Sequence, residues 1–107
     1  MTVAPAEVFA ALGDPHRLAL LQRLSRDGQA TATSLAAPLP VSRQAVTKHL
    51  RVLEGAGLLR TRRTGREVLY LVRPDALARQ ARWLDDVAAV WERRLAGVKA
   101  AAEKGDG

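Results

Sequence analysis

Residues 41–57 carry the side chains best suited to a defined chemistry, which is hydrogen bonding to the edges of nucleic-acid bases. A spacing of i, i+3, i+4 and i+7 places four polar residues on one face of a predicted helix, namely Gln44, Thr47, Lys48 and Arg51. Amide and cationic side chains contact base edges in a DNA major groove, and hydroxyl groups can assist them. A solvated amphipathic helix is the competing interpretation, but its outer face would normally include acidic residues.

The sequence also indicates where this helix begins and ends and which of its faces is buried. Ser42 is suited to cap its start, because a serine oxygen can accept a backbone N–H that has no partner in the first turn. Gly55 and Gly57 mark its end. The face opposite the polar residues is apolar and consists of Val46, Leu50 and Leu53. This face is predicted to pack into a core while the polar face stays exposed.

A basic hairpin is predicted directly after this helix. Two β-prone runs, 59–63 and 66–72, flank Thr64 and Gly65, and Gly65 can supply the positive φ that such a turn often needs. The arginines at its tip are Arg62, Arg63 and Arg66. Leu69 and Leu71 are predicted to face the core, with Tyr70 pointing the other way at the edge of the core. A basic hairpin after a polar-faced helix is the layout of a winged helix-turn-helix.

Three segments resemble the signature of ArsR-type (ArsR/SmtB) bacterial repressors. They are residues 41–59 (VSRQAVTKHLRVLEGAGLL), 11–21 (ALGDPHRLALL) and 65–71 (GREVLYL). The resemblance runs in one register from about residue 6 to residue 99. It implies a winged helix-turn-helix fold, a homodimer that involves the first and last helices, and base contacts by Gln44, Thr47 and Lys48.

The positive charge of the chain is concentrated where DNA contact is predicted. The formal net charge is +6, and residues 43–73 alone hold eight Arg or Lys against two Glu. A local excess of this kind suggests a face that binds a polyanion. A membrane surface would favour a single amphipathic basic helix, whereas this excess is shared between a helix and a hairpin. RNA is a weaker option because the deep groove of A-form RNA excludes such a helix.

Three shorter helices are predicted before residue 41. The first spans 5–12, and the second is opened by Asp14 and Pro15. The third is capped by Thr31 or Thr33 and ends before Pro38. The predicted buried ridge of the second helix consists of Leu18, Leu21 and Leu24, with Leu20 beside them. His16 is predicted to be a plain surface residue in the first turn of this helix.

A long last helix is predicted over about 74–104, and its apolar residues recur at alternating spacings of four and three. This spacing is typical of a helix that pairs with another helix. Trp83, Val87 and Val90 form a second apolar strip, and a chain of 107 residues has little core left to cover both strips. We therefore expect self-association. The predicted dimer interface consists of Phe9, Leu77, Leu84, Ala88, Trp91, Leu95 and Val98, with Phe9 included because the resemblance implicates the first helix.

Catalysis and metal binding find little support in the sequence. No serine has a plausible His–acid partner, so no enzyme is expected. The chain has no cysteine, which excludes disulfides and thiolate metal sites. The positions where related metal sensors carry third-helix cysteines are Ala36 and Pro38, and the last helix has no histidine. No metal and no cofactor are therefore expected, and the resemblance is to the metal-independent branch of the family.

The sequence thus predicts one winged helix-turn-helix domain over residues 1–107, mainly α-helical, with about five helices and a β-hairpin wing. We expect a sequence-specific regulator that binds double-stranded DNA, acting as a dimeric repressor on an inverted-repeat operator. The alternatives are a winged-helix protein-interaction module and a repressor with atypical carboxylate metal ligands. A bacterial cytoplasmic location is expected because no secretory or membrane-spanning segment is seen. The residues expected to contact DNA are Ser42, Arg43, Gln44, Thr47, Lys48, His49, Arg51, Arg62, Arg63 and Arg66. For His49, a half-buried structural role is weighed equally against a phosphate contact.

Overall fold

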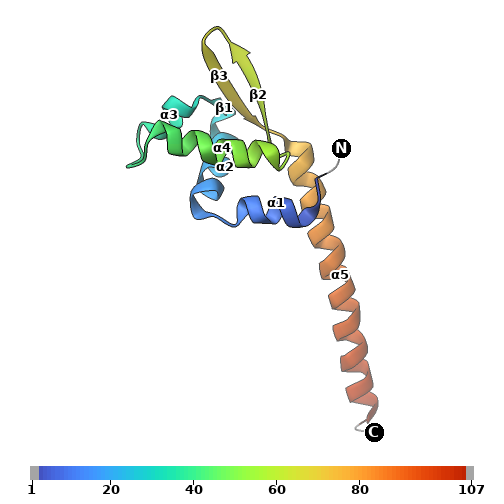
Figure 1. The fold of residues 1–107 in the computed structure, drawn as a ribbon. Helices are drawn as coiled ribbons and strands as arrows, with labels where there is room; N and C mark the ends of the chain where they lie inside the picture. Colours follow the sequence, from blue (N-terminus) through green and yellow to red (C-terminus); the bar gives the residue numbers. More distant parts are fainter. Residues whose placement is uncertain (1–2, 106–107) are drawn as a thin grey trace. The chain divides into compact units, whose positions relative to one another are not determined.

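The computed structural model describes residues 3–105, and the chain divides into two compact units after Leu77 (Figure 1). The first unit contains α1 (Pro5–Leu12), α2 (Pro15–Asp27), β1 (Gln29–Ala30), α3 (Ala32–Ala36), α4 (Arg43–Gly55), β2 (Leu59–Thr64) and β3 (Glu67–Val72). Helix α5 (Pro74–Gly105) begins in the first unit and continues through the second. Five helices and a small antiparallel sheet confirm the predicted winged helix-turn-helix architecture.

Three helices begin directly after residues that the sequence marks as caps. The Asp14 carboxylate caps α2, accepting from the backbone N–H groups of His16 and Arg17, and Thr31 rather than Thr33 caps α3. The Ser42 hydroxyl accepts from the backbone N–H of Ala45 at 3.1 Å and so caps α4. Each cap satisfies donors that lack partners inside the first helical turn. The start of α4 is thereby fixed at Arg43.

A single apolar core holds the helices and sheet of the first unit together. Its fully buried residues include Leu24, Leu35, Val46, Leu50, Leu53 and Leu58. The inner face of α4 is therefore buried as predicted. Leu18 is a correction, because it is 42% exposed, while Leu20 is buried with Leu21 and Leu24. The buried face of α2 is centred on Leu20 and Leu24, and Leu18 lies on its flank.

The wing is part of a three-stranded sheet with the strand order β1-β3-β2, all antiparallel. Gly65 adopts a φ of 61° in the turn between β2 and β3, as the hairpin prediction requires. Strand β1 was not predicted, because two residues are too few to show a strand pattern. In Figure 1, the hairpin lies on one side of α4 and α1 lies on the other, and both β2 and α1 contact α4.

The predicted inner face of β3 is wrong by one residue. Tyr70 is buried, at 7% exposure, and Val68 and Val72 pack against the core beside it, whereas Leu69 and Leu71 are only half-buried. Side chains alternate along a strand, so a shift of one residue exchanges the two faces completely. The aliphatic residues on both faces made the choice ambiguous. The ring of Tyr70 packs into the core.

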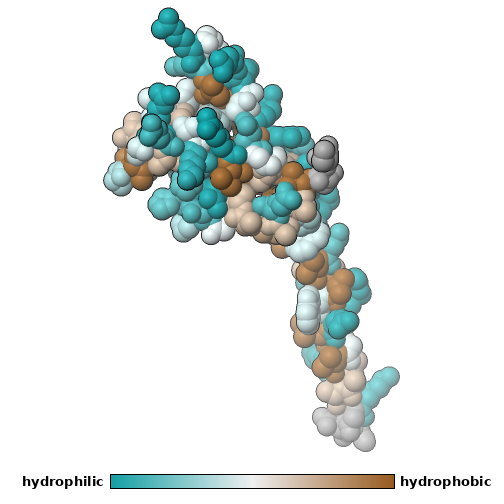
Figure 2. Space-filling model, in the orientation of Figure 1, coloured by the Kyte–Doolittle hydropathy of each residue, from teal (hydrophilic) through white to brown (hydrophobic). Residues whose placement is uncertain are grey.

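The second unit is the remainder of α5, and large apolar side chains line it. Trp91, Leu95 and Val98 are 59%, 63% and 68% exposed, and the exposed set also includes Trp83, Leu84, Val87 and Val90. Figure 2 shows apolar side chains gathered along the length of this helix. Leu77 differs from the other predicted interface residues, because it is half-buried against the core of the first unit. Within residues 3–105, no helix is long and apolar enough to cross a membrane.

Candidate nucleic-acid interface

Helix α4 presents an exposed polar face on which no acidic residue occurs between Arg43 and Arg51, while Glu54 follows in the last turn. Arg43, Gln44, Lys48 and Arg51 are all exposed, and Thr47 is half-buried between them. The positions follow from the helical period, because Val46, Leu50 and Leu53 are buried on the other side. The structure therefore places these five residues on one side of α4, whereas His49, which was also expected to contact DNA, lies apart from them against His16. The five residues offer one amide and three cations to a ligand.

The hydroxyl proton of Thr47 is already used in a hydrogen bond within α4. Oγ1 of Thr47 donates to the backbone carbonyl of Arg43 at 2.9 Å, one turn earlier in the same helix. Bonding of this kind is common for threonine inside helices. The hydroxyl oxygen can still accept a hydrogen bond, and the methyl group is of the type that contacts the methyl group of thymine.

The arginines of the wing do not all face the same way. In the register of the hairpin, Arg63 lies opposite Val68 and Arg62 lies opposite Leu69. Residues opposite each other share a face, so Arg63 lies on the face of β3 that Val68 and Tyr70 occupy, and Arg62 lies on the other face. Arg62 donates to the Oε1 of Gln29 at 3.0 Å, which ties the wing to β1.

A cleft of about 540 Å³ lies between α3, α4 and the wing. Helix α4 contributes Arg43, Thr47 and Arg51 to its lining, and the wing contributes Arg66 and Tyr70 among others. The N-terminal part of α3 adds three hydroxyl residues that were not predicted, namely Thr31, Thr33 and Ser34. Hydroxyl groups next to arginines are common partners of phosphate oxygens. The cluster of hydroxyl residues at 31–34 was the available signal, but Thr31 and Thr33 were interpreted only as possible helix caps, and Ser34 was given no role.

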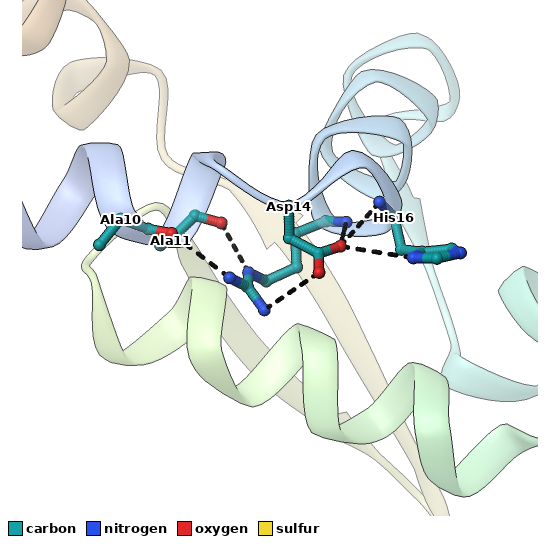
Figure 3. Close-up of polar contacts among 5 residues, drawn as sticks. Ala10, Ala11, Asp14 and His16 are labelled. Atoms are coloured by element: carbon teal, nitrogen blue, oxygen red, sulfur yellow. Dashed lines mark hydrogen bonds and ion pairs between the residues drawn. The ribbon is translucent and has the colours of Figure 1, made fainter.

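The two histidines of the chain lie together, although His16 is exposed as predicted. Their rings stack with centroids 5.6 Å apart and planes inclined by 19°. Nδ1 of His16 lies 3.5 Å from Oδ1 of Asp14, and Figure 3 shows this ring beside the carboxylate. His49 is half-buried, which agrees with the structural role that was considered for it beside a phosphate contact. The sequence could not show the pairing because α2 and α4 meet only in the folded chain.

The Asp14 carboxylate is held in its ionised form. Desolvation raises its pKa, but hydrogen bonds from the backbone N–H groups of Arg17 and His16 oppose this effect, as do the charges of Arg17 and His49. The net result is a pKa below that of an ordinary aspartate. The guanidinium group of Arg17 also donates to the carbonyl oxygens of Ala11 and Ala10, at 2.6 and 3.3 Å. The turn between α1 and α2 is thereby fixed around Asp14.

Known proteins have sequences similar to that of this chain. A helix-turn-helix domain family matches residues 12–62. An HTH-type transcriptional regulator of Mycobacterium tuberculosis is 38% identical over 94 residues, which cover 88% of this chain and 84% of that protein. The chain belongs to the ArsR/SmtB family. A transcriptional repressor SmtB homolog of Synechocystis is 45% identical over 65 residues, which are 61% of this chain but only 48% of that protein. The family consists of transcriptional regulators and not of enzymes.

Solved structures of this family share the fold. An ArsR-like transcriptional regulator from Rhodococcus has a TM-score of 0.80 and 45% identity, with 89% of each chain covered. A homodimeric winged helix-turn-helix DNA-binding domain from Mycobacterium bovis has a TM-score of 0.61 and 26% identity, covering 81% of this chain and 77% of that one. Both similarities extend beyond the helix-turn-helix itself.

Proposed function

We propose that this protein is a homodimeric transcriptional repressor that binds double-stranded DNA in a sequence-specific manner in the bacterial cytoplasm. The observation that carries the proposal is the exposed polar face of α4, which has no acidic residue from Arg43 to Arg51 and borders a cleft whose other walls are α3 and a basic wing. An α-helix of this kind fits the width of a B-form major groove, and cations beside it fit the flanking phosphates. Membership of a family of winged helix-turn-helix regulators supports the same function.

The contacts divide into those that read bases and those that hold the backbone. Gln44, Lys48 and the methyl group of Thr47 are proposed to read base edges, since they occupy the exposed face of α4. Arg43 and Arg51, at the cleft, are proposed to contact phosphates or bases. In the wing, Arg63 and Arg66 are proposed to hold phosphate or the adjacent minor groove. Arg62 would have to exchange its bond to Gln29 for a phosphate.

The proposed dimer uses α5. Its exposed apolar residues lie along one strip of the helix, and exposing this strip to water is unfavourable. A second copy of the helix can cover the strip. The homodimeric relative from Mycobacterium bovis supports this assembly. Leu84, Ala88, Trp91, Leu95 and Val98 form the proposed seam. The proposal also includes Phe9 of α1, and it gives Leu77 a smaller part because Leu77 already packs against its own core.

We also propose that the protein does not sense metals through cysteine sites. The chain contains no cysteine, so it cannot supply the thiolates that bind arsenite or cadmium tightly. DNA recognition as proposed needs no cofactor.

Substituting one residue of α4 and one of the wing should separate base reading from phosphate binding. Gln44→Ala should weaken binding to the operator by ~1–3 kcal/mol and change binding to random DNA much less, because base contacts carry the sequence preference. Arg63→Ala should weaken binding to both by similar factors, because phosphate contacts carry no sequence information. Fluorescence anisotropy titrations at one fixed salt concentration measure both effects.

Gln22→Ala is the matched control, since Gln22 is an exposed glutamine on α2 and lies outside the proposed interface. It should leave binding to both DNAs unchanged. A loss of sequence preference in Arg63→Ala together with a uniform loss in Gln44→Ala would show that the roles of α4 and the wing are reversed. Unchanged binding in both variants would refute the proposed interface.

A further inference from the structure

We infer that Asp14, His16 and His49 form a binding site for one divalent transition-metal ion of the Zn²⁺ type. The ligand atoms that these three residues offer all lie within 4.8 Å of one another. They form the one group of three or more such residues within residues 3–105. The inference goes beyond the proposed DNA binding, which needs no metal. It also departs from the expectation of no metal site, which was made without knowing that His16 and His49 lie side by side.

The donor set suits this class of ion. Two imidazole nitrogens and one carboxylate oxygen are typical ligands of Zn²⁺, and three protein ligands leave the fourth position to water. With metal–ligand bonds of about 2.0–2.1 Å, two ligands of a tetrahedral ion lie roughly 3.4 Å apart. Nδ1 of His16 and Oδ1 of Asp14 are already 3.5 Å apart. To complete the site, the two rings have to turn out of their stack so that a nitrogen of His49 comes within a similar distance of the other two ligand atoms.

The fold holds one ligand in place and lets another move. Oδ1 of Asp14 accepts from the backbone N–H groups of His16 at 2.8 Å and Arg17 at 3.2 Å, so the carboxylate is oriented before any ion binds. Hydrogen bonds of this kind to a ligating group raise the affinity of metal sites. The side chain of His16 is 70% exposed and can turn toward an ion at little cost.

The surroundings allow entry and affect the strength of binding. His16 and His49 border a hollow of about 160 Å³ whose other walls are mostly aliphatic, including Leu20, Leu39 and Val46. An apolar wall limits competing water and strengthens the attraction between an ion and the Asp14 carboxylate. The guanidinium group of Arg17 opposes binding, since it lies 3.9 Å from Oδ2 of Asp14.

The full-length protein, free of DNA, is the material for the test. Equilibrium dialysis against Zn²⁺ should give one ion per chain, and Co²⁺ should give the intense visible absorption of a tetrahedral site. His16→Ala, His49→Ala and Asp14→Asn should each weaken binding at least tenfold. Asparagine is also a good N-cap, so Asp14→Asn removes the charge and retains the start of α2. Because His16 is exposed, His16→Ala should fold even if His49→Ala does not.

Asp85→Asn is the control, since Asp85 is an exposed carboxylate of α5 outside the site. It should bind Zn²⁺ as the unmodified protein does. The imidazole proton signals of both histidines should shift together on addition of one equivalent of Zn²⁺. Binding that is unaffected by His16→Ala, or a shift of only one histidine, would overturn the inference and leave Asp14 and the histidines as a structural contact. Because no DNA is present, neither result depends on the proposed function.

Discussion

Replacing Trp91 and Leu95 together by aspartate should make the protein monomeric and remove its preference for the operator. Both side chains are largely exposed on α5 and lie in the proposed seam. Two carboxylates per subunit would be buried without partners if the seam still formed, and apolar packing does not offset that cost. A monomer reaches only one half-site, so affinity for the operator should approach that for random DNA, a loss of about 10³-fold or more.

Sedimentation equilibrium and operator titration together measure this effect. The matched control is Ala96→Asp with Ala100→Asp, which adds the same charge to the same exposed helix. By the helical period these two positions lie on the face opposite the seam. The control should remain dimeric and bind the operator. A double variant of Trp91 and Leu95 that is folded, monomeric and undiminished in affinity would refute the dimer proposal.

Affinity for DNA should fall steeply as the salt concentration rises. If each subunit neutralises about four phosphates, the dimer neutralises about eight, and log K against log salt should have a slope of roughly −7. Raising the salt from about 50 to 200 mM should then weaken binding by about 10⁴-fold. Arg43, Arg51, Arg63 and Arg66 are the cations proposed to account for most of this slope.

A variant with Arg63→Ala and Arg66→Ala should make the slope shallower by about four per dimer, or roughly one for each contact removed. A slope shallower than about −2 for the unmodified protein would rule out the proposed binding face. A winged-helix module that binds only other proteins would show no salt-dependent binding to random DNA at all.

The sequence predicted those parts of the fold that depend on local signals. Ser42 and Asp14 marked the starts of α4 and α2 because a cap bonds to backbone groups only two or three residues away. Gly65 marked the wing because its turn needs a positive φ. The exposed face of α4 followed from the helical period and the burial of Leu50 and Leu53. Such features are encoded within a few residues of the chain.

What the sequence did not predict depends on contacts between distant segments. Strand β1 exists because Gln29 and Ala30 pair with β3. The inner face of β3 was misassigned because both faces carry aliphatic residues, and only packing against α2 and α3 makes Tyr70 the buried one. His16 and His49 meet only because α2 packs on α4. Thr31 and Thr33 were predicted only as possible caps, because the cleft that they line with Ser34 exists only when α4 and the wing are in place.

The most direct test of the account is selection of bound fragments from the genome of the source organism, followed by sequencing. A two-fold dimer places its two α4 helices in successive major grooves on one side of the duplex. The enriched fragments should therefore share an imperfect inverted repeat with half-site centres roughly 10–11 base pairs apart, or near twice that distance for a wider dimer. Enrichment of a direct repeat or a single half-site, or no enrichment, would contradict the account.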